Sequence, residues 1–174
     1  MHRNEYFCEP CTQAQEKVVR TFLLKKSNIV RLTAVTWSEI SWFKIRRFGG
    51  HRDLCFREIF GQLKPFFLKK VVNNKRYNNI VQSKRSKFTH YFFMLSPEIK
   101  KKLQEETLFW TIYQTISKYF YGFEDPVFYS DEIMIGSVIT HMRQLNLFLR
   151  DEEKKALEMK SVKLLRVVGN KLVK

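Results

Sequence analysis

Two segments in the C-terminal half of the chain place apolar residues at the spacing of an amphipathic helix. The first follows Ser130, a residue type that caps helices, and has Asp131 and Glu132 in its first turn, where acids favour the helix dipole. Its apolar stripe consists of Ile135, Val138, Met142, Leu145 and Leu149. The second stripe consists of Leu157, Leu164, Leu165, Val168 and Leu172. Because the polar stretch between them, residues 150–160, is short, the two helices are expected to pack as an antiparallel hairpin.

Another helix is predicted before this pair, over residues 96–122. Ser96 can cap it, Pro97 suits its first position, Glu98 lies in its first turn and Gly122 ends it. Its apolar residues also recur mostly every three or four positions. The pattern therefore predicts an all-α fold for the C-terminal part of the chain, a three-helix bundle that contains the antiparallel helical hairpin.

Residues 1–95 are predicted to be a basic N-terminal extension, for which the pattern fixes no single structure. Residues 17–60 can be divided into a helix followed by a short strand, or into two strands. The whole chain has 32 Lys and Arg against 17 Asp and Glu, a formal net charge of +15. Such an excess favours a polyanionic partner, most commonly nucleic acid. Aromatic residues make up 15% of the chain, which is not typical of a disordered basic tail.

An acid-free stretch, residues 59–97, closes this extension. One interpretation is a solvated basic loop. The other is an arm that lies along phosphates and positions nucleic acid without reading its sequence, with Tyr77 or Phe88 available to stack on bases. The overall charge favours the arm. It contains Lys64, and its predicted RNA contacts are Lys69, Lys70, Lys75, Arg76, Lys84, Arg85 and Lys87.

The stretch KLLRVVGNK, residues 163–171, closely resembles the start of the third helix in the bacterial-type small-subunit ribosomal protein fifteen family. Ser130, Glu132 and Ile133 match three residues of that family's signature, and SVITHMRQLNLFLR is similar to its second helix. The resemblance covers residues 106–174. It implies that residues 96–174 are a helical rRNA-binding domain, with the chain a divergent mitochondrial member of the family.

The resemblance also implies a place for Gly169 inside the third helix. A small residue there would allow close approach of another helix or of RNA backbone. The alternative is a tolerated helical glycine without a role.

The family holds the rRNA minor groove with a basic connection between its second and third helices. Here that connection contains Glu152 and Glu153 in place of cations, Met134 replaces the signature glutamine, and Tyr129 replaces the preceding glycine. The family's contacts therefore transfer only in part. The predicted RNA contacts of this half are two residues at family positions and four cations of the connecting region: Ser130, Lys171, Lys154, Lys155, Lys160 and Lys163.

These features predict a structural constituent of the small ribosomal subunit that binds and stabilises small-subunit rRNA beside neighbouring ribosomal proteins. The expected location is the ribosome of the mitochondrial matrix. The N-terminus lacks transit-peptide character, and the abundance of Phe, Lys, Asn, Tyr and Ile suggests an AT-rich gene that could be organelle-encoded. Two alternatives stay open. One is a non-ribosomal basic nucleic-acid-binding protein, and the other is an accessory subunit of an organellar membrane complex whose cations face anionic lipid.

Catalysis and membrane insertion are not expected. The chain contains no Ser/His/Asp arrangement, glycine-rich phosphate loop or nucleotide motif, so neither an enzyme nor a small-molecule substrate is predicted. No apolar run is long enough to span a bilayer. Cys8, Cys11, His51 and Cys55 have the ligand types of a zinc site, but the long separation of the two pairs leaves incidental thiols as the alternative, and no cofactor is assigned.

Overall fold

The computed structural model describes residues 3–8, 12–34, 60–73, 88–105, 123–140, 144–169 and 171–173. These residues form one antiparallel sheet of nine strands, with helices on one of its sides. The strands are β1 (Asn4–Cys8), β2 (Ile29–Ala34), β3 (Phe67–Asn73), β4 (Phe88–Met94), β5 (Phe123–Ser130), β6 (Ile133–Ile139), β7 (Gln144–Leu149), β8 (Leu164–Val168) and β9 (Lys171–Val173). The helices are α1 (Gln13–Lys26), the short 3-10 helix η2 (Lys64–Phe66), α3 (Pro97–Gln104) and α5 (Asp151–Glu158).

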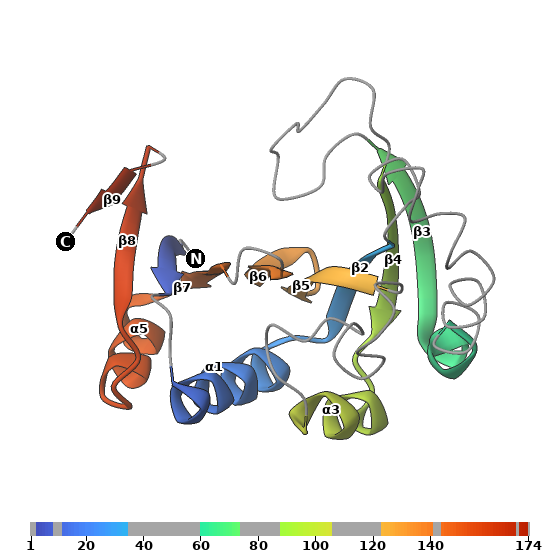
Figure 1. The fold of residues 1–174 in the computed structure, drawn as a ribbon, viewed down its shortest axis with the longest axis horizontal. Coiled ribbons are helices and arrows are strands. Elements are labelled where there is room, and N and C mark those ends of the chain that lie inside the picture. Colours follow the sequence, from blue (N-terminus) through green and yellow to red (C-terminus); the bar gives the residue numbers. More distant parts are fainter. Residues whose placement is uncertain are drawn as a thin grey trace, which may run out of the picture.

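The strands follow the order β3-β4-β2-β5-β6-β7-β1-β8-β9 across the sheet. Helices α1, α3 and α5 lie along one side of it, while β8 at one end and β3 and β4 at the other extend past the central strands on the opposite side (Figure 1). The predicted all-α fold, a three-helix bundle with an antiparallel hairpin, is therefore wrong. The described residues form a sheet with helices on one face.

The segment predicted as the helix after Ser130 forms two strands instead. Asp131, with φ of 55°, and Glu132 make the turn between β5 and β6, and Ser130 pairs with Ile133 across it. Strand β7, QLNLFL, buries every second residue. A strand that buries alternate residues also buries residues four apart, a spacing that an amphipathic helix shares. This coincidence explains why the spacing of Leu145 and Leu149 predicted a helix.

The segment predicted as the last helix is divided between a helix and a hairpin. Helix α5 occupies the stretch that was expected to be a polar link, and β8 pairs with β9 directly after it. Gly169 lies in the turn of this hairpin with φ of +56°, a left-handed conformation that costs glycine little. Strands β6 to β9 thus occupy the segments in which the family resemblance implies its second and third helices.

Replacing Gly169 with alanine is expected to lower the free energy of unfolding by about 1 kcal/mol, because a Cβ disfavours the left-handed region. Among the described residues, no atom lies within 4 Å of the position that this Cβ would take, so the backbone alone would cause the loss. A glycine inside a helix would give the opposite sign, since alanine is favoured there. Urea unfolding of Gly169→Ala measures the difference. Gly169→Asn is the control, because asparagine tolerates this conformation, and a stabilised alanine variant would contradict the hairpin.

Local signals placed the start of one helix correctly, whereas the division of residues 17–60 was left open. The predicted helix start at Ser96 is confirmed, since its Oγ accepts a hydrogen bond from the Ile99 amide at 3.2 Å. The rest of that predicted helix, residues 106–122, lies outside the described part of the chain. In the N-terminal half, α1 is followed by β2, which agrees with the first of the two divisions considered for residues 17–60. A capping box starts α1, in which the Gln15 amide donates to Thr12 Oγ1 and the Thr12 amide to Gln15 Oε1.

One hydrophobic core lies between the helices and the sheet. Its helical side is formed by Val19, Leu23, Leu24, Ile99 and Leu157, all at most 4% exposed. Its sheet side comes from most of the strands and includes Tyr6, Cys8, Val30, Leu32, Phe93, Phe128, Leu145, Leu147 and Leu149. Gly136 on β6 allows α1 to approach closely, because a Cβ there would lie 2.7 Å from Leu23 Cδ2.

Strands from both halves of the sequence alternate in this sheet. β1 pairs with β7 on one side and with β8 on the other, and β2 pairs with β4 and β5. Residues 1–95 and 96–174 therefore contribute to the same sheet and the same core. No helix in the described part of the chain has the length and apolar character needed to cross a bilayer.

Candidate nucleic-acid interface

The face of the sheet opposite the helices, called the open face below, is identified by alternation along each strand. In β2, Val30 and Leu32 belong to the core, so Arg31 and Thr33 point to the other side. In β7, Leu145 and Leu147 point to the helices, and Asn146 points away. No helix of the described residues covers this second face (Figure 1).

Cross-strand pairing aligns one row of open-face residues over eight strands. From β3 to β8 the row is Lys69, Phe92, Arg31, Val127, Ser137, Asn146, Phe7 and Leu165. Directly opposed side chains of neighbouring strands are within contact distance of one another. The row therefore begins with an exposed cation, Lys69, and ends with the partly exposed Asn146, Phe7 and Leu165. Its middle positions, Arg31, Val127 and Ser137, are buried, so the face is accessible toward its two ends.

An aromatic patch with a lysine above it lies at the β3 end of the open face. The patch consists of Ile29, Lys69, Phe92, Met94, Tyr129 and Met134, which neighbour one another in the registers of β2 to β6. The ring centroids of Phe92 and Tyr129 are 6.1 Å apart with 36° between their planes. Lys69 Nζ lies 4.9 Å from the centroid of the Phe92 ring, within cation–π range. Both rings are partly exposed, and Met94 is 48% exposed.

Buried polar residues adjoin this patch on the same face of the sheet, where Arg31 pairs with Phe92. Burial lowers the pKa of the Arg31 guanidinium, and the nearby Tyr129 and Asp125 act in the opposite direction. Asp125 is itself held by a reciprocal pair of bonds: the Thr140 amide donates to Asp125 Oδ1 at 2.9 Å, and the Asp125 amide donates to Thr140 Oγ1 at 3.1 Å. Arg31 therefore interacts electrostatically with both Tyr129 and Asp125.

A buried histidine continues this polar layer toward β3. His90 is 1% exposed, with Nδ1 3.0 Å from Thr33 Oγ1 and Nε2 3.2 Å from Asn73 Oδ1. Since an amide oxygen only accepts hydrogen bonds, Nε2 must hold the proton that is shared with Asn73. Phe88, one of the two rings expected to stack on bases, is 2% exposed and is therefore buried in the fold.

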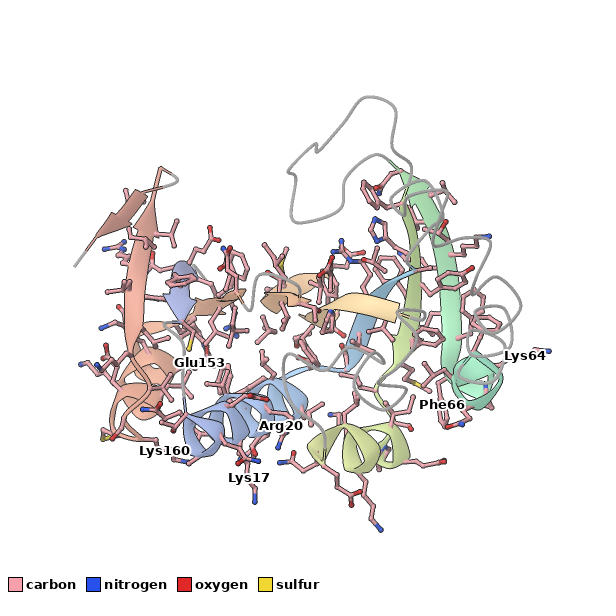
Figure 2. The ribbon with its side chains drawn as sticks, in the orientation of Figure 1. Lys17, Arg20, Lys64, Phe66, Glu153 and Lys160 are labelled. Atoms are coloured by element: carbon pink, nitrogen blue, oxygen red, sulfur yellow. The ribbon has the colours of Figure 1, made fainter. Side chains whose placement is uncertain are left out.

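The predicted RNA-binding residues fall into two groups at opposite ends of the sheet. Lys69 and Lys70 lie on β3, at one edge of the strand order, whereas the cations at positions 154, 155, 160 and 163 lie on α5 and between it and β8. Figure 2 shows this separation, with Lys64 near β3 and Lys160 beside α5. Ser130 is half-buried at the end of β5, and Lys171 lies in β9. The other predicted contacts of the acid-free stretch, Lys75, Arg76, Lys84, Arg85 and Lys87, lie outside the described residues.

The α5 end is less suited to a polyanion than the β3 end. Helix α5 contains four acids and two lysines in the sequence DEEKKALE. Lys154 Nζ is 2.8 Å from Glu158 Oε1, and this hydrogen bond raises the pKa of Lys154. Its charge is therefore already partly neutralised within the helix.

Glu153, at a position where the resemblance implies a cation, has a structural role. It is 5% exposed and forms ion pairs with Arg3 at 2.6 Å, Arg150 at 3.0 Å and Lys26 at 3.4 Å. Burial by itself would raise the pKa of Glu153, but hydrogen bonds from Arg150 and Arg3 outweigh it and lower this pKa to about 2. The carboxylate thus joins the chain before β1, helix α1 and helix α5 (Figure 2).

Of the candidate zinc ligands, the structure describes one. Cys8 is 3% exposed on β1 and belongs to the core beneath the helices. Cys11, His51 and Cys55 lie outside the described residues. Among the residues that are described, no three His, Cys, Asp or Glu side chains gather as a metal site would require.

Phe92 and Tyr129 were not identified as binding residues from the sequence. The alternation in FTHYFFM indicates a strand with Phe92 on one face, but the partner ring on β5 is brought beside it only by long-range pairing through β2. Tyr129 was noticed only as a departure from a family signature. The chain was compared with protein-family models, curated proteins and solved structures, and none of them matches it.

Proposed function

We propose that the protein binds single-stranded nucleic acid on the open face of its sheet, with bases stacked on Phe92 and Tyr129. The observation that supports this most is the pair of partly exposed rings, Phe92 and Tyr129, with the Lys69 ammonium group over the Phe92 ring. Flat aromatic side chains on a sheet are a common platform for unpaired bases, and a cation beside them suits the phosphates. The net charge of +15 supplies the long-range attraction that such a protein needs.

The charges around the patch also favour one direction for the phosphate backbone. Lys69 lies on the β3 side of the open face, within the acid-free segment 59–97, whereas its neighbour Lys70 pairs with Tyr91 on the opposite face. On the other side, Asp131 and Glu132 occupy the turn that follows Tyr129. A strand whose phosphates run along β3, with its bases pointing toward β5, avoids these two acids.

The experiment is fluorescence anisotropy with a labelled twelve-residue oligouridine, compared with a labelled RNA duplex. Phe92→Leu and Tyr129→Leu keep an apolar side chain but remove the π-face. Each is expected to weaken oligouridine binding about tenfold, since one stacked base contributes about 1–3 kcal/mol. Phe66→Leu on η2 is the matched control, because it makes the same change outside the patch.

Two results would overturn the proposal. One is equal binding of the duplex and the single strand, which would indicate attraction by charge alone. The other is an unchanged oligouridine affinity in both leucine variants while circular dichroism shows them folded. A loss of affinity that is as large in Phe66→Leu as in the patch variants would also count against stacking.

Salt dependence tests the role of Lys69 separately. Each phosphate contact with a single strand contributes about 0.7 to the slope of log K against log salt. Lys69→Gln is therefore expected to make that slope shallower by about 0.7, whereas Lys101→Gln on the exposed side of α3 should leave it unchanged. Equal slopes in the parent and both variants would show that Lys69 does not contact a phosphate.

Small-subunit rRNA stays the sequence-based prediction for the natural partner within this class. We propose this partner from the resemblance of residues 163–171 and from the net charge. The proposal assumes no RNA contact beyond those given above. Sedimentation of a native lysate with and without RNase tests it. Comigration with the small ribosomal subunit that RNase abolishes would support it, and migration at the size of the free chain would contradict it.

A further inference from the structure

A second surface lies at the edge of the sheet, along β3. This strand has seven residues, Phe67–Asn73, and β4 is its sole partner among the described strands. The outer side of an edge strand presents backbone N–H and C=O groups that can pair with another chain. A register shift between Phe67 and Lys69 interrupts the beginning of the strand, so the regular edge runs from Lys69 onward.

Large apolar side chains are exposed along this edge. Phe67 is 38% exposed, Leu68 49% and Val72 52%, and all three belong to the same strand. Soluble proteins usually protect such an edge with a proline, a short strand or outward-pointing lysines. Pro65 precedes β3 and does not lie within it.

The two lysines of β3 do not extend beyond the edge. Lys69 Nζ lies 4.9 Å from the centroid of the Phe92 ring, and Lys70 Nζ lies 5.7 Å from the centroid of the Tyr91 ring. Both rings belong to β4, the next strand inward, and they lie on opposite faces of the sheet. Each ammonium group is therefore drawn back over the sheet, and within the described part of the chain no strand pairs with the outer backbone of β3.

Charge identifies the kind of chain that fits. The sequence has no acidic residue from 59 to 97, and β3 contains adjacent lysines. A second copy of this strand would bring like charges opposite one another, which is destabilising in a sheet. An extended acidic segment, with apolar residues at every second position, would instead pair with the backbone, cover Leu68 and Val72, and neutralise the lysines.

We propose that β3 binds an acidic, extended segment of a partner protein as an additional strand of the sheet. The site differs from the aromatic patch, because it uses the strand edge and the face of Lys70 rather than the rings of Phe92 and Tyr129. It therefore does not depend on the proposed binding of nucleic acid.

The test uses the full chain and a fluorescein-labelled nine-residue peptide of alternating glutamate and valine. Two control peptides differ by a single property: one has prolines in place of the two central valines, and the other has lysine in place of glutamate. Binding of the first peptide is expected to be about tenfold tighter than that of the proline peptide, which loses backbone donors, and the lysine peptide is expected not to bind. Amide hydrogen exchange at residues 67–73 should slow when the first peptide is bound.

A matched pair of protein variants distinguishes peptide binding at the β3 edge from general electrostatic attraction. Lys70→Glu is expected to weaken binding of the glutamate–valine peptide about fivefold. Lys101→Glu on α3 makes the same change in charge away from the edge and should have little effect on this affinity. Equal losses in both variants, or equal binding of the proline peptide, would overturn the proposal. The proposal would also be overturned if oligouridine, and not the peptide, slowed amide exchange at residues 67–73. Self-association of the free chain in sedimentation equilibrium, with slowed exchange at the same residues, would overturn it as well.

Discussion

Gly136→Val is expected to lower the free energy of unfolding by about 3 kcal/mol, at the upper end of the usual cost of overpacking a core. A Cβ at this position would lie 2.7 Å from Leu23 Cδ2, 3.1 Å from Leu147 Cδ2 and 3.2 Å from the backbone oxygen of Asn146. Both leucines are fully buried, so neither side chain has free space into which to move. Valine otherwise favours strands, so a loss on this scale would come from steric conflict with α1 rather than from β-propensity.

Urea unfolding of five variants measures this effect. Gly61→Ala is the control, because among the described residues no atom lies within 4 Å of its Cβ position, and it should be neutral or slightly stabilising. The smaller change Gly136→Ala is paired with Leu23→Ala in a double-mutant cycle. If Leu23 is the conflicting neighbour, Gly136→Ala should cost little in the Leu23→Ala background. A Gly136→Val variant as stable as the parent would show that α1 does not lie this close to β6.

Glu153→Gln is expected to destabilise the protein by about 3 kcal/mol at neutral pH, and the difference should disappear in acid. A carboxyl pKa lowered from its usual value of 4.5 to about 2 corresponds to about 3 kcal/mol. Because the folded state has the lower pKa, this stabilisation is complete above the unfolded pKa and is lost as the pH falls toward 2. For a chain of this length the loss at neutral pH corresponds to a melting temperature lower by about 6–12 °C.

The measurement is the difference in unfolding free energy between parent and variant from pH 6 to pH 2. The control is Glu158→Gln, which makes the same change of charge in the same helix but breaks an exposed pair with Lys154, and it should cost less than about 1 kcal/mol. A Glu153→Gln penalty that is the same at pH 2 and pH 6 would show that the carboxylate charge is not what stabilises the fold. A penalty no larger than that of Glu158→Gln would show that the buried cluster is of little energetic importance.

The parts of the fold that the sequence predicted correctly depend on signals within a few residues. Ser96, Pro97 and Glu98 define a helix start by capping and by the dipole, and α3 begins there. The wrong predictions depend on spacing alone. Leu145 and Leu149 satisfy a helix and a strand equally, and only the pairing of β7 with both β6 and β1 decides between them. The acids of α5 were interpreted as a link although they occupy a helical first turn.

The candidate site was predicted only in its charge. The lysines of β3 belong to the acid-free stretch that composition identifies directly. The rings that they contact are more than 20 residues away in sequence, and the Phe92–Tyr129 pair forms across β2, which comes from a third part of the chain. No local pattern indicates which face of an alternating strand stays uncovered, because that depends on where the helices pack. The charge of the site can therefore be read from the sequence, whereas the pairing of Phe92 with Tyr129 depends on the order of the strands in the sheet.

The position of β1 between β7 and β8 sets an order of events during synthesis. Asn4 pairs with Leu149, so the two residues leave the ribosome 145 positions apart. At about 5–20 residues per second, β1 waits roughly 7–30 s for its first partner strand. During that time its backbone and the apolar side chains of Tyr6 and Cys8 have no sheet to join, and contacts so distant in sequence also slow the final search. The nascent chain should therefore depend on chaperones, and moving β1 to follow β9 by circular permutation should speed folding without altering the finished sheet.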